Sequence, residues 1–369
     1  MTPLGPSTST RKTLKLPHVT ALDGVRGLAS VTVVFHHALW EVVSPVPVGP
    51  VTHVIQQAAS FGYLAVDLFF VLSGYLITNL LLLSRRQPHY YRNFYWKRVF
   101  RILPAMFLIL ALSAHLFHFP WIGIFAALLF FADIPITSIP EVGPYWSLSI
   151  EEQFYMLWPT ILHRTRPRTV FRITLGLIIG AAILRTAFTA TGHGRVQYSP
   201  LHCDGLAWGA LLALLAFRAR VPYRSLNRAA LWRRHRWILF AGSAAMVFAI
   251  FLLHTSVRNL GLPITAAEPL FAGLLLFLIT HPRSWPARIL ASPPFVWLGN
   301  ISYMVYLSHA YLMVLYDQHL QSLLRPGTEA GLYLRLGIVL AATLLWSTLT
   351  LYLFERPIGR LRRYFTLPA

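Results

Sequence analysis

Long apolar stretches are the feature of this sequence that most restricts its fold. Only 12% of the residues are charged, whereas a soluble chain carries about 25%. At about 1.5 Å of rise per residue, a helical run of roughly 20 residues crosses the hydrocarbon core of a membrane. Backbone groups that face lipid must pair internally, which excludes an open sheet. We therefore predict an all-α, polytopic membrane protein with ten spans, at 22–42, 62–83, 101–118, 146–163, 171–190, 201–217, 237–255, 264–281, 298–320 and 332–354.

The positions of the charged residues predict how these spans are oriented. The formal net charge is +20, and most Lys and Arg residues lie in the segments that link alternate pairs of spans. With the N-terminus in the cytoplasm, this bias follows the positive-inside rule, so we predict that both termini are cytoplasmic and that the charge does not indicate a nucleic-acid site. Five of the 32 basic residues fall on the other side, namely Arg185, Arg195, Arg258, Arg325 and Arg335.

One further apolar run, residues 121–133, is too short to cross the bilayer. Counting it as a span would move the basic cluster at 218–236 out of the cytoplasm, so we predict a short re-entrant or interfacial helix there. The chain then divides into a polar cytoplasmic tail (1–20), a transmembrane domain (21–356) and a basic cytoplasmic tail (357–369).

The first predicted span carries polar residues that a membrane helix rarely keeps without a role. Arg26 lies near its cytoplasmic end, and a histidine pair, His36 and His37, follows at greater depth. Eleven residues at about 100° each return to nearly the same face, so Arg26 and His37 share one side of the helix, and His36 faces elsewhere. Such residues face a cavity or a partner. For both histidines, a hydrogen bond between helices is the alternative to a catalytic role.

Seven motifs in this chain resemble, in the same order, those of the membrane-bound acyltransferase family three, over about residues 20 to 360. One such motif would be weak evidence, but seven in order are specific. They are LDGVRGLASVTVVFHHA (22–38), AVDLFFVLSGYLIT (65–78), RVFRILPA (98–105), YWSLSIEEQFYMLWP (145–159), HCDGLAWGALLA (202–213), LGNISYMVYLSHA (298–310) and LFERPIGR (353–360).

The resemblance implies an integral membrane enzyme that moves an acyl group, usually acetyl from acetyl-CoA, to a hydroxyl of a glycan, a lipid or a small molecule. It implies that His37 is the catalytic histidine and Arg26 its basic partner. The chain departs from the family in having His36 where an apolar residue is usual. Histidine suits the removal of the hydroxyl proton because it titrates near neutral pH. Two routes stay open, namely direct base catalysis and an acyl-histidine relay.

The acyl donor is a polyanion, and the sequence offers a basic group to hold it. Arg98 and Arg101 lie three residues apart at the predicted cytoplasmic start of the third span, and arginine forks match phosphate geometry. We assign them, with Ser73, to the binding of acyl-CoA. Contact with lipid headgroups is the alternative for the arginines. No spacing of His, Cys or carboxylate residues indicates a metal site.

Few acidic residues lie within the predicted spans. Asp67, Glu151 and Asp204 are all predicted on the outer side, where they could bind the hydroxyls of an acceptor or orient a histidine. Glu151 matches the fixed acidic position of the family and is assigned to catalysis, whereas Asp67, Asp204 and Trp146 are assigned to the acceptor. Pairing with Arg185, Arg195 or a backbone donor is the structural alternative. His309, predicted at a depth similar to that of His37, either completes the site or is a satisfied core histidine.

Rival functions follow from the same features. A transporter or flippase of a lipid-linked sugar would also need many spans and buried charges, but it predicts repeated halves with interrupted helices, which the sequence lacks. A non-catalytic scaffold would have no use for His37, His309 and Glu151. Family members often carry an extracytoplasmic hydrolase-like domain after the last span, and we expect none here. A small-molecule acceptor is a further alternative.

Overall fold

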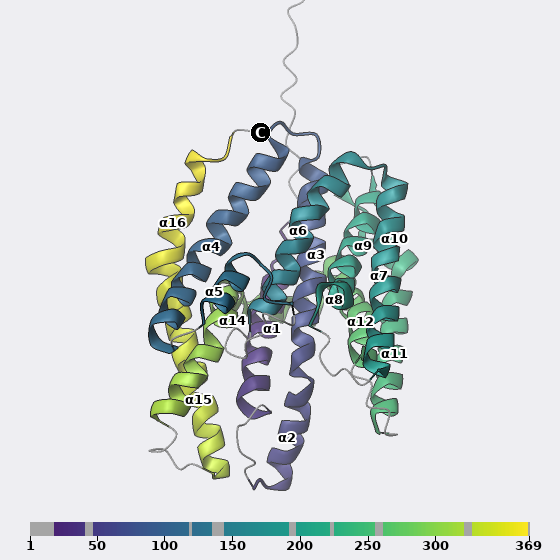
Figure 1. Cartoon of the computed structure of the whole chain (residues 1–369). Helices are drawn as coiled ribbons and strands as arrows, with labels where there is room; N and C mark the ends of the chain where they lie inside the picture. The colour runs from purple at the N-terminus through teal and green to yellow at the C-terminus, as the bar shows by residue number, and fades with distance from the viewer. Residues whose placement is uncertain are drawn as a thin grey trace, which may run out of the picture.

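The computed structural model describes residues 18–40, 47–117, 120–134, 144–191, 197–221, 225–254, 261–320 and 327–367. These segments are almost entirely helical, apart from one antiparallel pair of two-residue strands, β1 (Arg220–Val221) and β2 (Ser225–Leu226). The all-α prediction is therefore confirmed for this part of the chain (Figure 1). Its long helices are α1 (Ala21–Leu39), α3 (Leu64–Ser84), α4 (Tyr90–Phe117), α6 (Tyr145–Arg164), α7 (Pro167–Ala190), α9 (Asp204–Arg218), α11 (Trp237–His254), α12 (Gly261–Thr280), α14 (Pro293–His319) and α15 (Glu329–Thr350).

Each of the ten predicted spans overlaps one of these helices. Within the described segments, six helical runs are both long and apolar enough to cross a membrane, so the chain is a multi-pass integral membrane protein. The count of ten spans and the location of both termini stay predictions. Residues 1–17 of the predicted N-terminal tail, and Arg195, Arg258 and Arg325, lie outside the described residues. The six runs are Pro50–Ser84, Tyr90–Leu116, Pro167–Ala190, Arg228–Leu252, Gly261–Thr280 and Glu329–Tyr364.

Two helical runs begin well before the predicted spans. The second span was predicted from residue 62, but α2 (Pro50–Ser60) and the 3₁₀ turn η1 (Phe61–Tyr63) precede α3. Proline at the first helical position favours the start of α2 at residue 50. The third span was predicted from residue 101, but α4 begins at Tyr90. Its first turns are rich in aromatic and basic residues, so hydropathy alone does not detect them.

The short helices connect or flank the long ones. Residues 121–128 form α5 (Trp121–Leu128), which confirms a short helix in the 121–133 run. After α15, the chain passes through a π-helical turn, η4 (Leu351–Glu355), into α16 (Arg356–Leu361) and a last 3₁₀ turn, η5 (Arg362–Tyr364). Helical structure therefore continues into the predicted C-terminal tail. The remaining short helices are α8 (Ser199–His202), α10 (Arg228–His235) and α13 (Trp285–Leu290).

Glycines allow the central helices to approach one another closely. A Cβ atom added to Gly74 of α3 would lie 2.0 Å from the carbonyl oxygen of Leu206 in α9. One added to Gly27 of α1 would lie 2.6 Å from the backbone nitrogen of Gly299 in α14. Small residues let membrane helices pack backbone to backbone in this way. Gly74 thus brings α3 against α9, and Gly27 brings α1 against α14.

Candidate functional site

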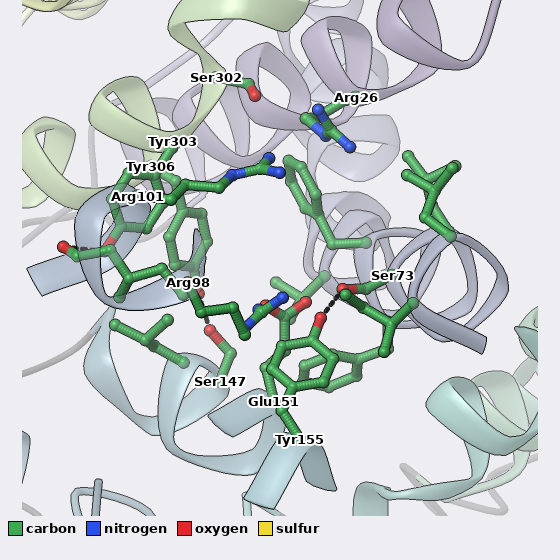
Figure 2. A pocket seen from close by; sticks show the side chains of 18 of the residues that line it. Arg26, Ser73, Arg98, Arg101, Ser147, Glu151, Tyr155, Ser302, Tyr303 and Tyr306 are labelled. Carbon is green, nitrogen blue, oxygen red and sulfur yellow. Dashed lines mark hydrogen bonds between the residues drawn. The ribbon is translucent and has the colours of Figure 1, made fainter. Parts of the chain in front are cut away.

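A cavity of about 120 Å³ lies among five helices near the centre of the molecule (Figure 2). Helix α1 contributes Arg26, and the other walls come from α3, α4, α6 and α14. Apolar side chains such as Phe69 and Leu307 cover part of the surface. The polar lining residues are Arg26, Ser73, Arg98, Arg101, Ser147, Glu151, Tyr155, Ser302, Tyr303 and Tyr306.

Positive charge dominates this cavity. Arg26 of α1 and Arg98 and Arg101 of α4 all line it, and Figure 2 shows their guanidinium groups turned toward its centre. Of the described residues that line it, Glu151 is the one carboxylate. Arg98 is also bound to Glu152, with 2.9 Å between Nη2 and Oε1. The arrangement favours an anionic or strongly polarised ligand.

Helix α6 places a row of polar groups on the cavity wall. Ser147, Glu151 and Tyr155 are four residues apart, so they lie on one face of the helix. The Tyr155 hydroxyl forms a hydrogen bond with Ser73 of α3, and the Arg98 guanidinium lies 3.4 Å above its ring. Ser147 and Tyr155 were not predicted, although their spacing from Glu151 was a signal that could have identified them.

Glu151 and the arginines Arg98 and Arg101 were predicted on opposite sides of the membrane, but the structure brings them together around one cavity. Glu152 contacts Arg98, which was predicted at the cytoplasmic start of a span. Because α4 begins at Tyr90, Arg98 lies eight residues, or about 12 Å, inside the helix. Arg98 and Arg101 therefore reach the interior, and Glu151 lines the same cavity as both arginines.

The histidines lie next to this cavity rather than in its wall. The rings of His37 and His309 are 5.2 Å apart between centroids, so the structure brings these two predicted residues together. Tyr306 links them to the cavity, because it lines the cavity and its ring centroid is 5.8 Å from that of His309. His309 Nδ1 donates a hydrogen bond of 2.7 Å to the Tyr306 carbonyl oxygen. In the neutral ring, Nε2 of His309 is thus the acceptor nitrogen.

Arg26 and His37 are not neighbours. They share a face of α1, as the sequence predicts, but eleven residues separate them by about 16 Å along the helix. Arg26 lines the cavity, whereas His37 lies in the last turn of α1, which ends at Leu39. The two side chains therefore cannot contact one carbonyl group at the same time in this structure.

His36 has a structural hydrogen bond. Its Nδ1 donates to the Ala59 carbonyl oxygen at 2.8 Å, and its side chain is buried against η1. This contact places the histidine pair level with residues 59–63, where the second span was predicted to begin. Both histidines lie in the last turn of α1, which ends at Leu39, and their depth in the membrane stays a prediction.

The last turn of α1 is fixed by two further helices. Arg335 Nη1 of α15 donates a hydrogen bond of 2.8 Å to the Ala38 carbonyl oxygen. Gln56 Nε2 of α2 donates one of 3.2 Å to the Leu39 carbonyl oxygen. Asp317 of α14 holds Arg335 through two bonds of 2.8 Å. Carbonyl groups at a helix C-terminus need such partners, and here those partners fix the turn that carries His37.

The residues predicted for the acceptor form a separate buried cluster. Asp67 Oδ1 is 2.8 Å from His202 Nε2. Asp204 accepts two bonds from the fully buried Arg185, at 2.9 and 2.6 Å. Trp146 packs against His202 with ring centroids 5.3 Å apart. None of Asp67, Asp204 and Trp146 lines the cavity, and the pairing of Asp204 with Arg185 is the predicted structural alternative. His202 was missed as the partner of Asp67.

No metal-binding arrangement is found in the described segments. Among their residues, no group of three or more His, Cys, Asp or Glu side chains could hold an ion.

Comparison with known proteins agrees with the predicted family. The sequence model of a family described as "Acyltransferase domain" matches residues 19–352. The peptidoglycan O-acetyltransferase OatA of Listeria monocytogenes is 26% identical over 385 residues, which cover 93% of this chain and 56% of that protein. The O-acetyltransferase OatA of Staphylococcus aureus is 25% identical over 344 residues, which cover 82% and 52%. The chain therefore spans about half the length of these curated relatives. No solved structure matches it.

Proposed function

The chain belongs to the acyltransferase family whose sequence model covers residues 19–352, and from that premise we propose that it transfers an acetyl group from acyl-CoA to a hydroxyl of an extracytoplasmic glycan. Its relatives are named as O-acetyltransferases, one of them acting on peptidoglycan. The observation that carries the proposal is a cationic cavity, lined by Arg26, Arg98 and Arg101, that lies next to a pair of imidazoles.

We place the chemical step at His37. Its imidazole takes the proton of the acceptor hydroxyl, and the alkoxide oxygen bonds to the thioester carbonyl carbon. The tetrahedral intermediate then loses its C–S bond, and the proton passes from His37 to the thiolate. The products are an ester and the free thiol of CoA, so atoms and charge balance. An acyl group carried first on His37 is the alternative route.

We assign the stabilisation of the oxyanion to His309. Its ring is 5.2 Å from that of His37, and in the protonated ring Nε2 becomes a second donor. Arg26 is about 16 Å from His37 along α1, so we assign it to the donor rather than to the oxyanion. The donor's acyl end then has to extend past Tyr306 to reach the imidazoles.

The cavity residues fit the remaining part of the donor. Arg98 and Arg101 supply the positive charge that a polyanion needs, and Ser73 supplies a hydroxyl. Glu151 and Glu152 orient the arginines, the latter through its 2.9 Å bond to Arg98. The carboxylates of Asp67 and Asp204 are engaged by His202 and Arg185, so our proposal gives them and Trp146 a structural role and places the acceptor at His37.

The topology that goes with this proposal has ten spans and two cytoplasmic termini. The donor enters from the cytoplasmic end, where α4 begins and basic residues are dense. His37, at the other end of α1 from Arg26, is then accessible to an acceptor from the opposite face. The protein would be part of the cell membrane, with acyl-CoA on one side and a carbohydrate on the other.

The test measures acetyl transfer by the purified full chain. We expect acetyl-CoA to release its thiol only with an acceptor present, and His37→Ala to abolish the release while leaving the melting temperature and CoA binding unchanged. His53→Ala, an exposed histidine of α2, is the matched control and should keep full activity. An active His37→Ala protein would refute the catalytic assignment, and movement of a lipid-linked sugar without thiol release would indicate a flippase.

A further inference from the structure

A second, wider hollow of about 350 Å³ lies beside the central cavity. We call it the C-terminal groove, because one wall is formed by η4, α16 and η5 and the other by the first half of α4 and the end of α3. Ile77, Arg98 and Arg101 line both hollows, so the two share a boundary at these residues. Figure 1 shows α16 beside α4 at the end of the molecule where the chain terminates.

The groove is strongly basic. Lys97, Arg98, Arg101, Arg356 and Arg362 line it, against a single lining carboxylate, Glu355. Within the described segments, Arg98 is the one member of this basic set with a carboxylate oxygen within 4 Å. The other four cations have no carboxylate oxygen within 4 Å, and with Glu355 as the single acidic lining residue the hollow keeps a net positive charge that favours an anionic ligand.

The backbone departs from α-helical geometry at the groove. Leu351 and Glu355, the first and last residues of the π-helical turn η4, both line it. Gly359 lines it as well, and a Cβ atom there would meet no atom within 4 Å. Single π-helical turns within α-helices occur frequently at functional sites. Here the turn precedes α16, which carries Arg356, and η5, which carries Arg362.

The two walls of the groove are joined by specific contacts. Asn93 of α4 forms two hydrogen bonds of 2.9 Å with the backbone of Leu367. The ring of Phe365 packs against those of Trp96 and Phe100, with centroid distances of 4.7 and 5.0 Å. The C-terminal segment is thus fastened to α4, and the groove is a formed site rather than a gap beside a loose tail.

We propose that the C-terminal groove binds the phosphate-bearing nucleotide end of acyl-CoA, chiefly through Lys97, Arg356 and Arg362. This inference rests on the proposed function, because it takes acyl-CoA as the donor. The pantetheine arm then passes Arg98 and Arg101 into the central cavity, and the thioester points toward Tyr306. Arginine guanidinium groups and a lysine ammonium are suited to binding phosphate groups. Because the two hollows share a boundary, one ligand can place its anionic nucleotide in the groove and its narrow pantetheine arm in the central cavity.

An anionic lipid headgroup has the same phosphate chemistry, so the test must separate the two sources. We would measure the equilibrium binding of CoA, dephospho-CoA and pantetheine to the purified full chain. The test variant is Arg356→Gln/Arg362→Gln. The control is Arg360→Gln/Arg363→Gln, which removes the same charge from the same segment at positions that do not line the groove.

The expected result is a Kd for CoA raised at least tenfold in the groove variant and less than threefold in the control, since charge-assisted hydrogen bonds are lost only in the former. Pantetheine binding should change in neither protein, and dephospho-CoA should lose less affinity than CoA. Equal losses in both variants would refute the groove site. So would unchanged CoA binding together with loss of co-purified anionic lipid, which would assign the groove to a headgroup.

Failure of the proposed function would be distinguishable. CoA binds without an acyl group, so its affinity does not depend on transfer. If CoA binding depends on the groove but no acetyl transfer occurs, the groove site stands and the proposed reaction is refuted. If the groove variant transfers acetyl groups and binds CoA with unaltered affinity, the reaction stands and the groove site is refuted.

Discussion

Gly74→Ala should disturb the packing of α3 against α9 and, with it, the wall of the central cavity. The added Cβ would lie 2.0 Å from the Leu206 carbonyl oxygen, and the neighbouring carbonyl carbon and Cα would be 2.8 and 2.9 Å away. Ordinary contact begins at 3.4 Å, and all three atoms are backbone atoms that cannot rotate away. The helices must therefore separate by roughly 1 Å, and overpacking of this kind costs about 1–3 kcal/mol.

The matched control is Gly180→Ala on α7, because a Cβ there would meet no atom within 4 Å. We would measure thermal unfolding of both variants in detergent. Each kcal/mol lowers the melting temperature by about 2–4 °C in a domain of 150–250 residues, so a cost of about 1–3 kcal/mol predicts a loss of roughly 2–12 °C for Gly74→Ala. The control should lose nothing, since alanine is the better helix former.

Helix α3 also carries Ser73, which lines the cavity. We therefore expect Gly74→Ala to weaken CoA binding as well, even at temperatures where it remains folded. Identical melting temperatures for the two variants would refute the close approach of α3 and α9.

Two further predictions concern the buried arginines. Arg335→Gln should lower kcat much more than it changes the Kd of CoA, because Arg335 holds the Ala38 carbonyl in the turn that carries His37; an unchanged kcat in steady-state assays would contradict this role. Asp204→Asn should cost about 3–5 kcal/mol, because it removes the carboxylate that accepts two charge-assisted hydrogen bonds from the fully buried Arg185; folded yield and melting temperature measure it, and a melting temperature like that of the unmodified protein would contradict it.

Hydropathy located the long helices because each requires a long apolar run whatever its neighbours are. It missed α2, which contains Thr52, His53, Gln56 and Gln57, and it missed the first turns of α4, where aromatic and basic residues form helix although their hydropathy is low. Hydropathy can thus underestimate the length of a helix. Because α4 was predicted to begin too late, Arg98 was predicted at the boundary of a span, whereas it lies inside the helix.

The pairings between helices could not be predicted in the same way. Helical periodicity correctly placed Arg26 and His37 on one face, because both belong to one helix. The contacts of Glu152 with Arg98 and of Asp67 with His202 depend on how separate helices rotate and slide against each other. That arrangement is set by packing rather than by the apolar length of each segment.

The backbones of α1 and α14 touch at Gly27 and Gly299, and Arg335 joins the far end of α1 to α14 through Asp317. Two helices fastened at both ends shift as one body. The spacing of the two imidazoles, one on each helix, is therefore set by this pair of helices.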